Sequence, residues 1–207
     1  MLDKSKIFLI ILLFTGNVIS KDIREFEAGI NVKELPTRGY QEIKCLNDEK
    51  VLEGWHQYEN CKQEENNLFY LNFEYDDKYA FNENFEGTQI AGHPVKINIG
   101  IKKNGILQEI NVITDDNAPF YFKKQAHLFW MRIRSKYGSD AWQCEDFKKE
   151  NNHIIINRKY VNKLCFKKVN NKKITYHTQL YFIGNKEKSN LVSKTLMSIS
   201  LVDKAKI

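Results

Sequence analysis

The feature that most constrains the fold is a run of alternating apolar and polar residues that ends at a tight turn. The alternation covers residues 95–102, and it is the pattern of a half-buried β-strand. Asn104-Gly105 follows, and this dipeptide is the strongest two-residue signal for a β-hairpin. A two-residue turn there places Ile99 opposite Ile110 and Ile101 opposite Gln108, which brings the apolar residues of both strands to one face. The sequence therefore predicts a hairpin near the middle of the chain.

A helix is predicted directly after this hairpin. Asp116 or Asn117 offers a cap, Pro119 suits the first turn, and Gly138 lies just past the expected end. Between these limits the apolar residues recur at helical spacing: Phe122, Ala126, Phe129, Ile133 and Tyr137. This stripe is typical of one long amphipathic helix that packs on a sheet.

Shorter alternating runs predict further strands on both sides of the hairpin and helix. They cover residues 69–75, 174–182 and 197–201, with others near 39–45 and 154–165. Strands, a hairpin, one helix and three more strands form the order of an α+β domain. We therefore expect a largely antiparallel β-sheet with one long amphipathic helix packed on one face, stabilised by two disulfides.

The first twenty residues have the three parts of a secretory signal peptide. Lys4 and Lys6 precede an apolar run over residues 7–14, and Val18 and Ser20 suit the −3 and −1 positions of a cleavage site. We expect residues 1–20 to be removed and residues 21–207 to form a single exported domain, periplasmic or extracellular. The alternative is a retained N-terminal membrane anchor. No later apolar run reaches the roughly 20 residues that a spanning helix needs, so the mature chain is expected to lack a transmembrane span.

The expected mature chain contains four cysteines, Cys45, Cys61, Cys144 and Cys165. An even number in an exported protein predicts two disulfides. Of the three pairings we favour Cys45 with Cys61 and Cys144 with Cys165, because each closes a short loop. The alternative is a zinc site, but the spacing lacks the C-x-x-C step that brings two thiolates to one metal. We expect neither a metal nor a cofactor.

Charge is divided unevenly along the chain. Positions 21–120 hold 11 basic and 19 acidic residues, whereas positions 121–207 hold 19 basic and 6 acidic residues. If the two parts intermix in the sheet, these charges neutralise each other as ordinary surface pairs. If the last strands and the helix share a face, that face attracts phosphate, anionic lipid or an acidic partner.

Six side chains are candidates for a binding surface. They combine cationic and imidazole groups with an indole that offers a stacking face: Lys123, His127, Trp130, Arg132, Arg134 and, at the start of the hairpin, His93. The alternative interpretation is that Trp130 borders the core and the cations extend into solvent.

The sequence contains none of the tested catalytic or cofactor motifs: no G-x-S-x-G, no H-E-x-x-H, no phosphate-binding glycine loop and no dinucleotide fingerprint. We therefore predict an exported, non-catalytic module that binds an unknown protein or anionic envelope partner through a basic C-terminal face. One alternative is an extracytoplasmic hydrolase built around His93 or His127 and a carboxylate. Another is an envelope or virulence accessory protein without a small ligand. Nucleic acid is not expected as a partner of an exported chain, and the sequence does not determine the oligomeric state.

Overall fold

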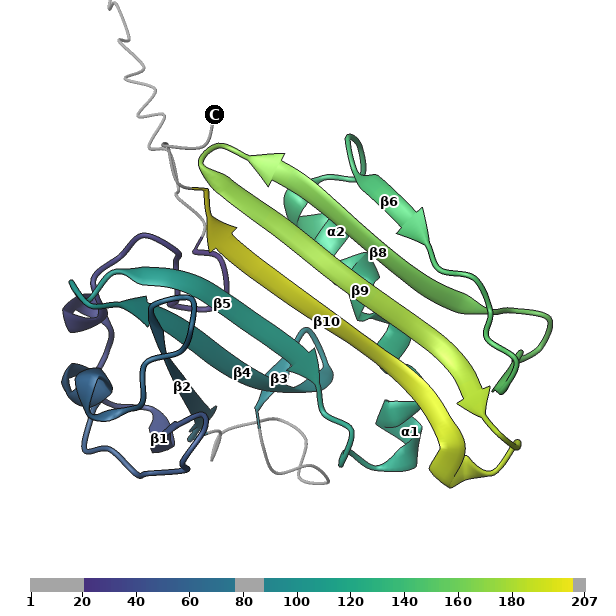
Figure 1. Cartoon of the computed structure of the whole chain (residues 1–207), viewed down its shortest axis with the longest axis horizontal. Coiled ribbons are helices and arrows are strands. Elements are labelled where there is room, and N and C mark those ends of the chain that lie inside the picture. Colours follow the sequence, from purple (N-terminus) through teal and green to yellow (C-terminus); the bar gives the residue numbers. More distant parts are fainter. Residues whose placement is uncertain (1–20, 77–87, 203–207) are drawn as a thin grey trace, which may run out of the picture.

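The computed structural model describes residues 21–76 and 88–202, and its main element is one twisted antiparallel β-sheet (Figure 1). Its strands lie in the order β1 (Tyr40–Cys45), β2 (Leu68–Tyr75), β4 (His93–Lys102), β5 (Leu107–Thr114), β10 (Leu191–Leu201), β9 (Lys172–Ile183), β8 (Val161–Val169) and β6 (Gln143–Asp146). Two short strands lie off this path: β3 (Gln89–Ile90) pairs with β4, and β7 (His153–Ile154) pairs with β9. The predicted signal peptide lies outside the described residues.

The predicted hairpin is present as β4 and β5, with a change of register at its tip. Ile99 faces Ile110 as predicted, but Ile101 faces Leu107 and not Gln108. The turn is longer than two residues, because the Gly105 N–H donates to the Lys102 carbonyl at 2.8 Å and Gly105 adopts a φ of +82°. A glycine in this left-handed conformation forms a β-bulge, which shifts the pairing by one residue.

The predicted single long helix is wrong, because the segment after the hairpin folds into three short pieces. They are α1 (Phe120–Lys123), the 3-10 helix η3 (Ala126–Leu128) and α2 (Phe129–Tyr137). At the break, the Thr178 hydroxyl donates to the His127 carbonyl at 2.8 Å, and the Thr195 hydroxyl donates to the Ala126 carbonyl at 3.1 Å. The two carbonyls lie at the interruption of the helical hydrogen bonds. The threonine hydroxyls of the sheet supply hydrogen-bond donors to them in place of backbone N–H groups of the segment itself. The fold is thus a large antiparallel sheet with short helical segments.

The two ends of this helical region follow local sequence signals only in part. α1 begins after Pro119, without a side-chain cap from Asp116 or Asn117. α2 ends at Tyr137, so Gly138 lies just past its end as predicted, and Gly138 has a φ of +87°. Glycine adopts this conformation without the steric cost of a Cβ atom, which is why it ends helices.

The inner face of the sheet is covered by α2 on one half and by the N-terminal segment, residues 21–35, on the other. α2 lies behind β8 and β9 in the view of Figure 1 and buries Phe129 and Ile133. The N-terminal segment includes the 3-10 helix η1 (Val32–Glu34) and carries Phe26, whose side chain is fully buried. The Phe26 ring contacts the aromatic rings of four residues from β1, β2 and the 3-10 helix η2 (Trp55–Asn60): Tyr40, Trp55, Phe73 and Tyr75. The sequence patterns did not predict that this segment belongs to the core.

The structure contains both disulfides in the pairing favoured from the sequence. Cys45–Cys61 joins β1 to the residue after η2 and is buried, whereas Cys144–Cys165 joins directly paired positions on β6 and β8. Two disulfides are typical of extracellular or periplasmic proteins and support an exported location. In the part of the chain that the structure describes, no helix has the length and apolar character to cross a bilayer.

Candidate functional site

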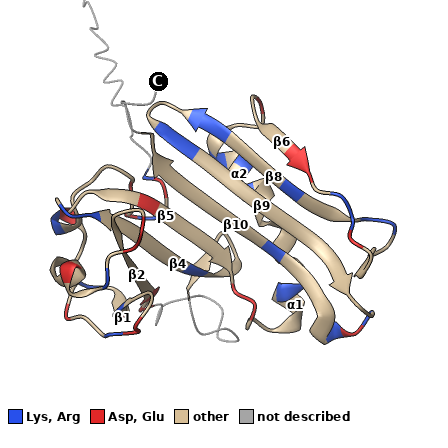
Figure 2. Ribbon diagram, in the orientation of Figure 1, with Lys and Arg blue, Asp and Glu red and all other residues tan. Residues whose placement is uncertain are grey.

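Charge is distributed according to the two halves of the sheet. The strand order keeps β1, β2, β4 and β5 on one side and β10, β9, β8 and β6 on the other, and the halves meet where β5 pairs with β10. Among the described residues, 10 basic and 16 acidic residues lie before position 121, whereas 17 basic and 5 acidic residues follow it. Figure 2 shows Lys and Arg on β8, β9 and the helical segments. The strands of the two parts therefore do not intermix in the sheet, although the N-terminal segment contacts Lys172 of β9, and the second half of the sheet is a basic half.

The six predicted surface residues do not form a single surface. α2 turns Trp130 towards Tyr176, with ring centroids 6.4 Å apart, and the Arg134 guanidinium lies 5.7 Å from the Trp130 ring. Arg132 lies on the opposite flank of α2, where it borders a groove. Lys123 is the last residue of α1.

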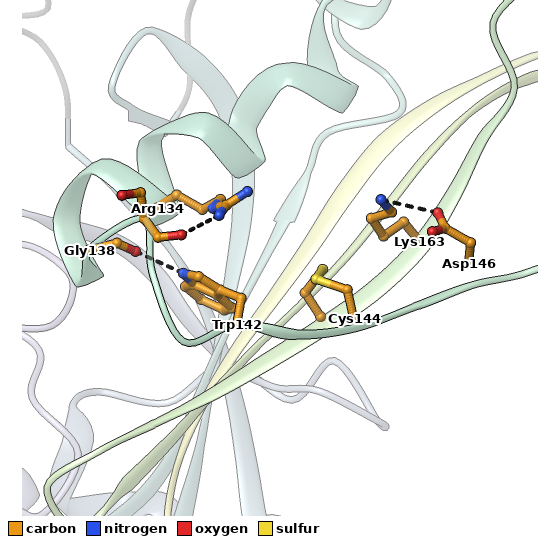
Figure 3. Close-up of a disulfide and its surroundings, with 8 residues drawn as sticks. Arg134, Gly138, Trp142, Cys144, Asp146 and Lys163 are labelled. Carbon is orange, nitrogen blue, oxygen red and sulfur yellow. Dashed lines mark hydrogen bonds and ion pairs between the residues drawn. A yellow bond between two sulfur atoms is a disulfide. The ribbon is translucent and has the colours of Figure 1, made fainter.

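Arg134 and Trp142 hold the chain in place after α2. Arg134 donates a hydrogen bond to the Ser139 carbonyl, and the Trp142 indole N–H donates to the Gly138 carbonyl at 2.7 Å (Figure 3). Trp142 also packs against Tyr176, next to the disulfide of Cys144. These contacts support the interpretation that Trp130 borders the core and that Arg134 has a structural role.

His127 is half-buried and contacts the sheet. Its Nδ1 lies 3.2 Å from the Ser193 Oγ, and Ser193 is 1% exposed. Burial lowers the pKa of His127 below its ordinary value of 6.5, although a hydrogen bond with the Lys124 backbone opposes the shift. Because Ser193 is buried, this pair does not present a nucleophile to a substrate.

An open groove of about 260 Å³ lies between α2 and the β3–β4 turn, and we call it the α2 groove. Its apolar lining comes from the N-terminal segment, the β3 region, α2 and β10: Ile23, Ile90, Ala91, Phe129, Ile133, Tyr137 and Met197. Its polar lining consists of Arg132, Ser135 and Lys136. Sequence reasoning identified Arg132 and the core role of the α2 stripe, but it missed Lys136, Ile23 and Ile90. No sequence signal links these residues, because they come from distant segments.

The two cationic side chains that line the α2 groove, Arg132 and Lys136, differ in whether other groups of the protein already bind them. Lys136 donates hydrogen bonds to the backbone carbonyls of Lys21 and Asp22, and burial lowers its pKa while the Asp22 carboxylate opposes that shift. Arg132 is exposed and has no hydrogen bond or ion pair among the described residues. A guanidinium beside an apolar groove suits a carboxylate or phosphate that is attached to an apolar group.

His93 lies next to this groove. Its ring centroid is 5.4 Å from that of Phe129, and burial together with the positive charge of Arg132 lowers its pKa. Within residues 21–76 and 88–202, the imidazole that approaches a carboxylate is that of His153, whose Nε2 lies 3.7 Å from Glu150 Oε2. This separation exceeds hydrogen-bond distance. The geometry therefore does not assemble the His–carboxylate site of the predicted alternative around His93 or His127.

Stability is expected to fall as the solution is acidified from about pH 7 to about pH 5. Burial is the main cause that lowers the pKa values of His93, His127 and His177 below the ordinary value of 6.5. The unfolded chain therefore binds protons that the folded chain does not, so the stabilising contribution is complete above pH 6.5 and is lost as the pH falls from there through the lower pKa values of the folded state. Urea unfolding across this range measures the effect, and His93→Gln should reduce the slope. A free energy of unfolding that rises on acidification would contradict this account.

No protein-family model matches the chain, and neither the curated proteins nor the solved structures contain a match to it.

Proposed function

We propose that this protein is an exported, non-catalytic binding module that takes up a single acyl chain with an anionic head group in the α2 groove. The observation that carries the proposal is the exposed guanidinium of Arg132, which lies at the rim of an apolar groove and has no ion pair with any residue that the structure describes. The apolar lining favours a hydrocarbon chain, because its burial contributes about 0.8 kcal/mol per methylene. The guanidinium favours a carboxylate or phosphate at the end of that chain.

The size and the electrostatic setting of the groove support the same ligand class. Its volume of about 260 Å³ is slightly below the roughly 300–1,000 Å³ of pockets for drug-sized molecules, so it suits one short chain better than a fused-ring compound. The groove also borders α2 in the basic half of the sheet, and the surrounding positive charge favours the approach of an anion.

Decanoate is expected to bind the purified protein, and Arg132→Gln is expected to weaken this binding by about tenfold or more, the equivalent of a lost charge-assisted hydrogen bond. Isothermal titration calorimetry measures the affinity. The thermal midpoint should stay nearly constant, because Arg132 is exposed and unpaired among the described residues. Arg134 is left intact, since it supports the turn after α2.

Two controls separate the site from general charge and general hydrophobicity. Lys124→Gln removes one exposed positive charge from the same helical region without altering the groove lining, and it should leave decanoate binding unchanged. Decyltrimethylammonium has the same chain with a cationic head, and we expect it to bind much more weakly than decanoate. Equal binding of the two amphiphiles, or equal decanoate binding by the Arg132→Gln variant, would contradict the proposal. Lysophosphatidate, tested in parallel, distinguishes a phosphate head from a carboxylate head.

A further inference from the structure

The outer face of the sheet, opposite α2 and the N-terminal segment, carries a row of uncharged side chains. Directly paired positions on β2, β4, β5, β10, β9 and β8 form this row: Asn72, Asn98, Asn111, Ser198, Thr175 and Phe166. With about 4.8 Å between neighbouring strands, the row is about 24 Å long. We call it the neutral row.

The polar groups of the neutral row have unused hydrogen-bonding capacity. The Asn111 side-chain amide donates to Asn98 Oδ1 at 3.0 Å, which leaves the Asn98 amide nitrogen and the Asn111 amide oxygen without a hydrogen bond in the described part of the chain. Asn72 Oδ1 is buried and also lacks a partner among these residues, and Asn72 lines a cavity at this end of the row beside charged residues such as Glu74 and Lys96. The half-buried Asn98 and Asn111 amides are therefore the groups of the row that a ligand on this face can reach.

Aromatic rings lie at both ends of the neutral row. Tyr70 is paired with Gly100, and a Cβ atom at Gly100 would lie 2.9 Å from Tyr70 Cε1. The missing side chain at Gly100 therefore lets the Tyr70 ring pack over the strand. The Tyr70 hydroxyl donates to Glu109 at 2.6 Å, which holds the ring in this position. At the other end, the half-buried Phe166 ring lies 5.0 Å from the Lys173 ammonium.

We propose that the neutral row is a second binding site, for a neutral polysaccharide chain that runs across the strands. Amide and hydroxyl side chains act as both donors and acceptors, which matches the hydroxyl groups of sugars. Aromatic rings provide apolar surfaces for the C–H faces of pyranose rings. An acidic polysaccharide would be repelled at the β2–β10 part of the row, where the Glu109 carboxylate accepts hydrogen bonds from Tyr70 and Ser198. A peptide in β conformation would pair with a sheet edge and not cross the face.

The test is an NMR titration of the ¹⁵N-labelled protein with cellohexaose, maltohexaose and chitohexaose, with hexagalacturonate as the anionic comparison. At least one neutral hexasaccharide is expected to shift the amide resonances of the neutral row. The Asn98→Ala/Asn111→Ala variant should weaken that binding by about tenfold or more, the equivalent of one or two hydrogen bonds. Asn47→Ala, an exposed asparagine in the turn after β1, is the matched control and should bind as the unaltered protein does.

Three results would each overturn the proposal. The first is the absence of shifts in the neutral row with all three neutral hexasaccharides. The second is binding by hexagalacturonate alone, with shifts confined to basic residues. The third is unaltered affinity in a folded Asn98→Ala/Asn111→Ala variant. Decanoate binding at the α2 groove is independent of these outcomes, because that groove lies on the inner face.

Discussion

Replacement of Phe26 by alanine is expected to lower the free energy of unfolding by about 3–5 kcal/mol, the range for large aromatic residues in a core. Phe26 is fully buried, and its ring is stacked on Phe73 at 4.8 Å and meets Trp55 edge to face at 5.7 Å. The deletion leaves a cavity among rigid rings that cannot collapse to fill it. Urea unfolding with a constant m-value measures the loss.

The matched control for Phe26 is Tyr121→Ala. Tyr121 is an aromatic residue of α1 that is 64% exposed, and its removal should change stability by less than about 0.5 kcal/mol. A loss below about 1 kcal/mol for Phe26→Ala would mean that the N-terminal segment does not complete the core. This segment directly follows the predicted cleavage site after Ser20, so the same experiment tests whether the start of the expected mature domain is essential for its stability.

Replacement of Lys172 by methionine is expected to lower the free energy of unfolding by about 3–5 kcal/mol at neutral pH, because it leaves a buried carboxylate unpaired. The Lys172 ammonium lies 2.8 Å from Asp22 Oδ2 and 3.2 Å from Glu27 Oε1. The Asp22 side chain is only 5% exposed and also accepts the Ala28 N–H at 2.9 Å. Methionine matches the length of the lysine stem but supplies no donor, so the loss reports mainly the charge.

The control for Lys172 is an exposed ion pair of similar geometry. Lys163 and Asp146 lie 3.2 Å apart at the surface between β8 and β6 (Figure 3), and their side chains are 39% and 71% exposed. Lys163→Met should cost less than about 1 kcal/mol, because water solvates both charges. Equal losses for Lys163→Met and Lys172→Met would show that burial does not strengthen the Lys172 pairs.

The pKa of Glu27 offers a second measurement on Lys172→Met that does not depend on the free energy of unfolding. Burial tends to raise the pKa of Glu27, but the hydrogen bond and charge of Lys172 outweigh it, with help from Lys21, and lower the pKa below 4.5. In the variant the Glu27 pKa should therefore rise, as an NMR titration of its carboxyl carbon can detect. A lowered carboxyl pKa stabilises the folded state above pH 4.5, and this contribution is lost as the pH falls through the folded-state value.

Local patterns predicted the elements that depend on neighbouring residues. Alternation from 95 to 102 and the turn residues identified β4 and β5, because strand faces repeat every two residues wherever the strand lies. Cysteine spacing led to the correct disulfide pairing, since short loops are entropically easiest to close. The pairing of Ile101 was wrong because Gly105 forms a bulge that the dipeptide alone does not reveal.

The predicted long helix is interrupted at a point where side chains of the sheet bind its backbone. The apolar stripe at Ala126, Phe129 and Ile133 does face the sheet, so the periodicity was informative about burial. At the break, the backbone carbonyls accept hydrogen bonds from the hydroxyl groups of Thr178 and Thr195, which lie 51 and 69 positions later in the chain than their acceptors. Helical periodicity reports which side of a segment is buried, but it does not report hydrogen-bond donors that the sheet brings to the same carbonyls.

The sequence alone determined a disulfide-bonded chain with an alternating, largely antiparallel strand pattern and an acidic first part followed by a basic second part. The tertiary structure decided that these parts occupy separate halves of one sheet, that Arg132 and Arg134 lie on opposite flanks of α2, and that Phe26 completes the core. The physical reason is the range of the interactions. Alternation and turn preference act between residues a few positions apart. Strand order, groove lining and buried ion pairs depend on contacts between segments that are distant in the chain, as Lys172 and Asp22 are at a separation of 150 positions.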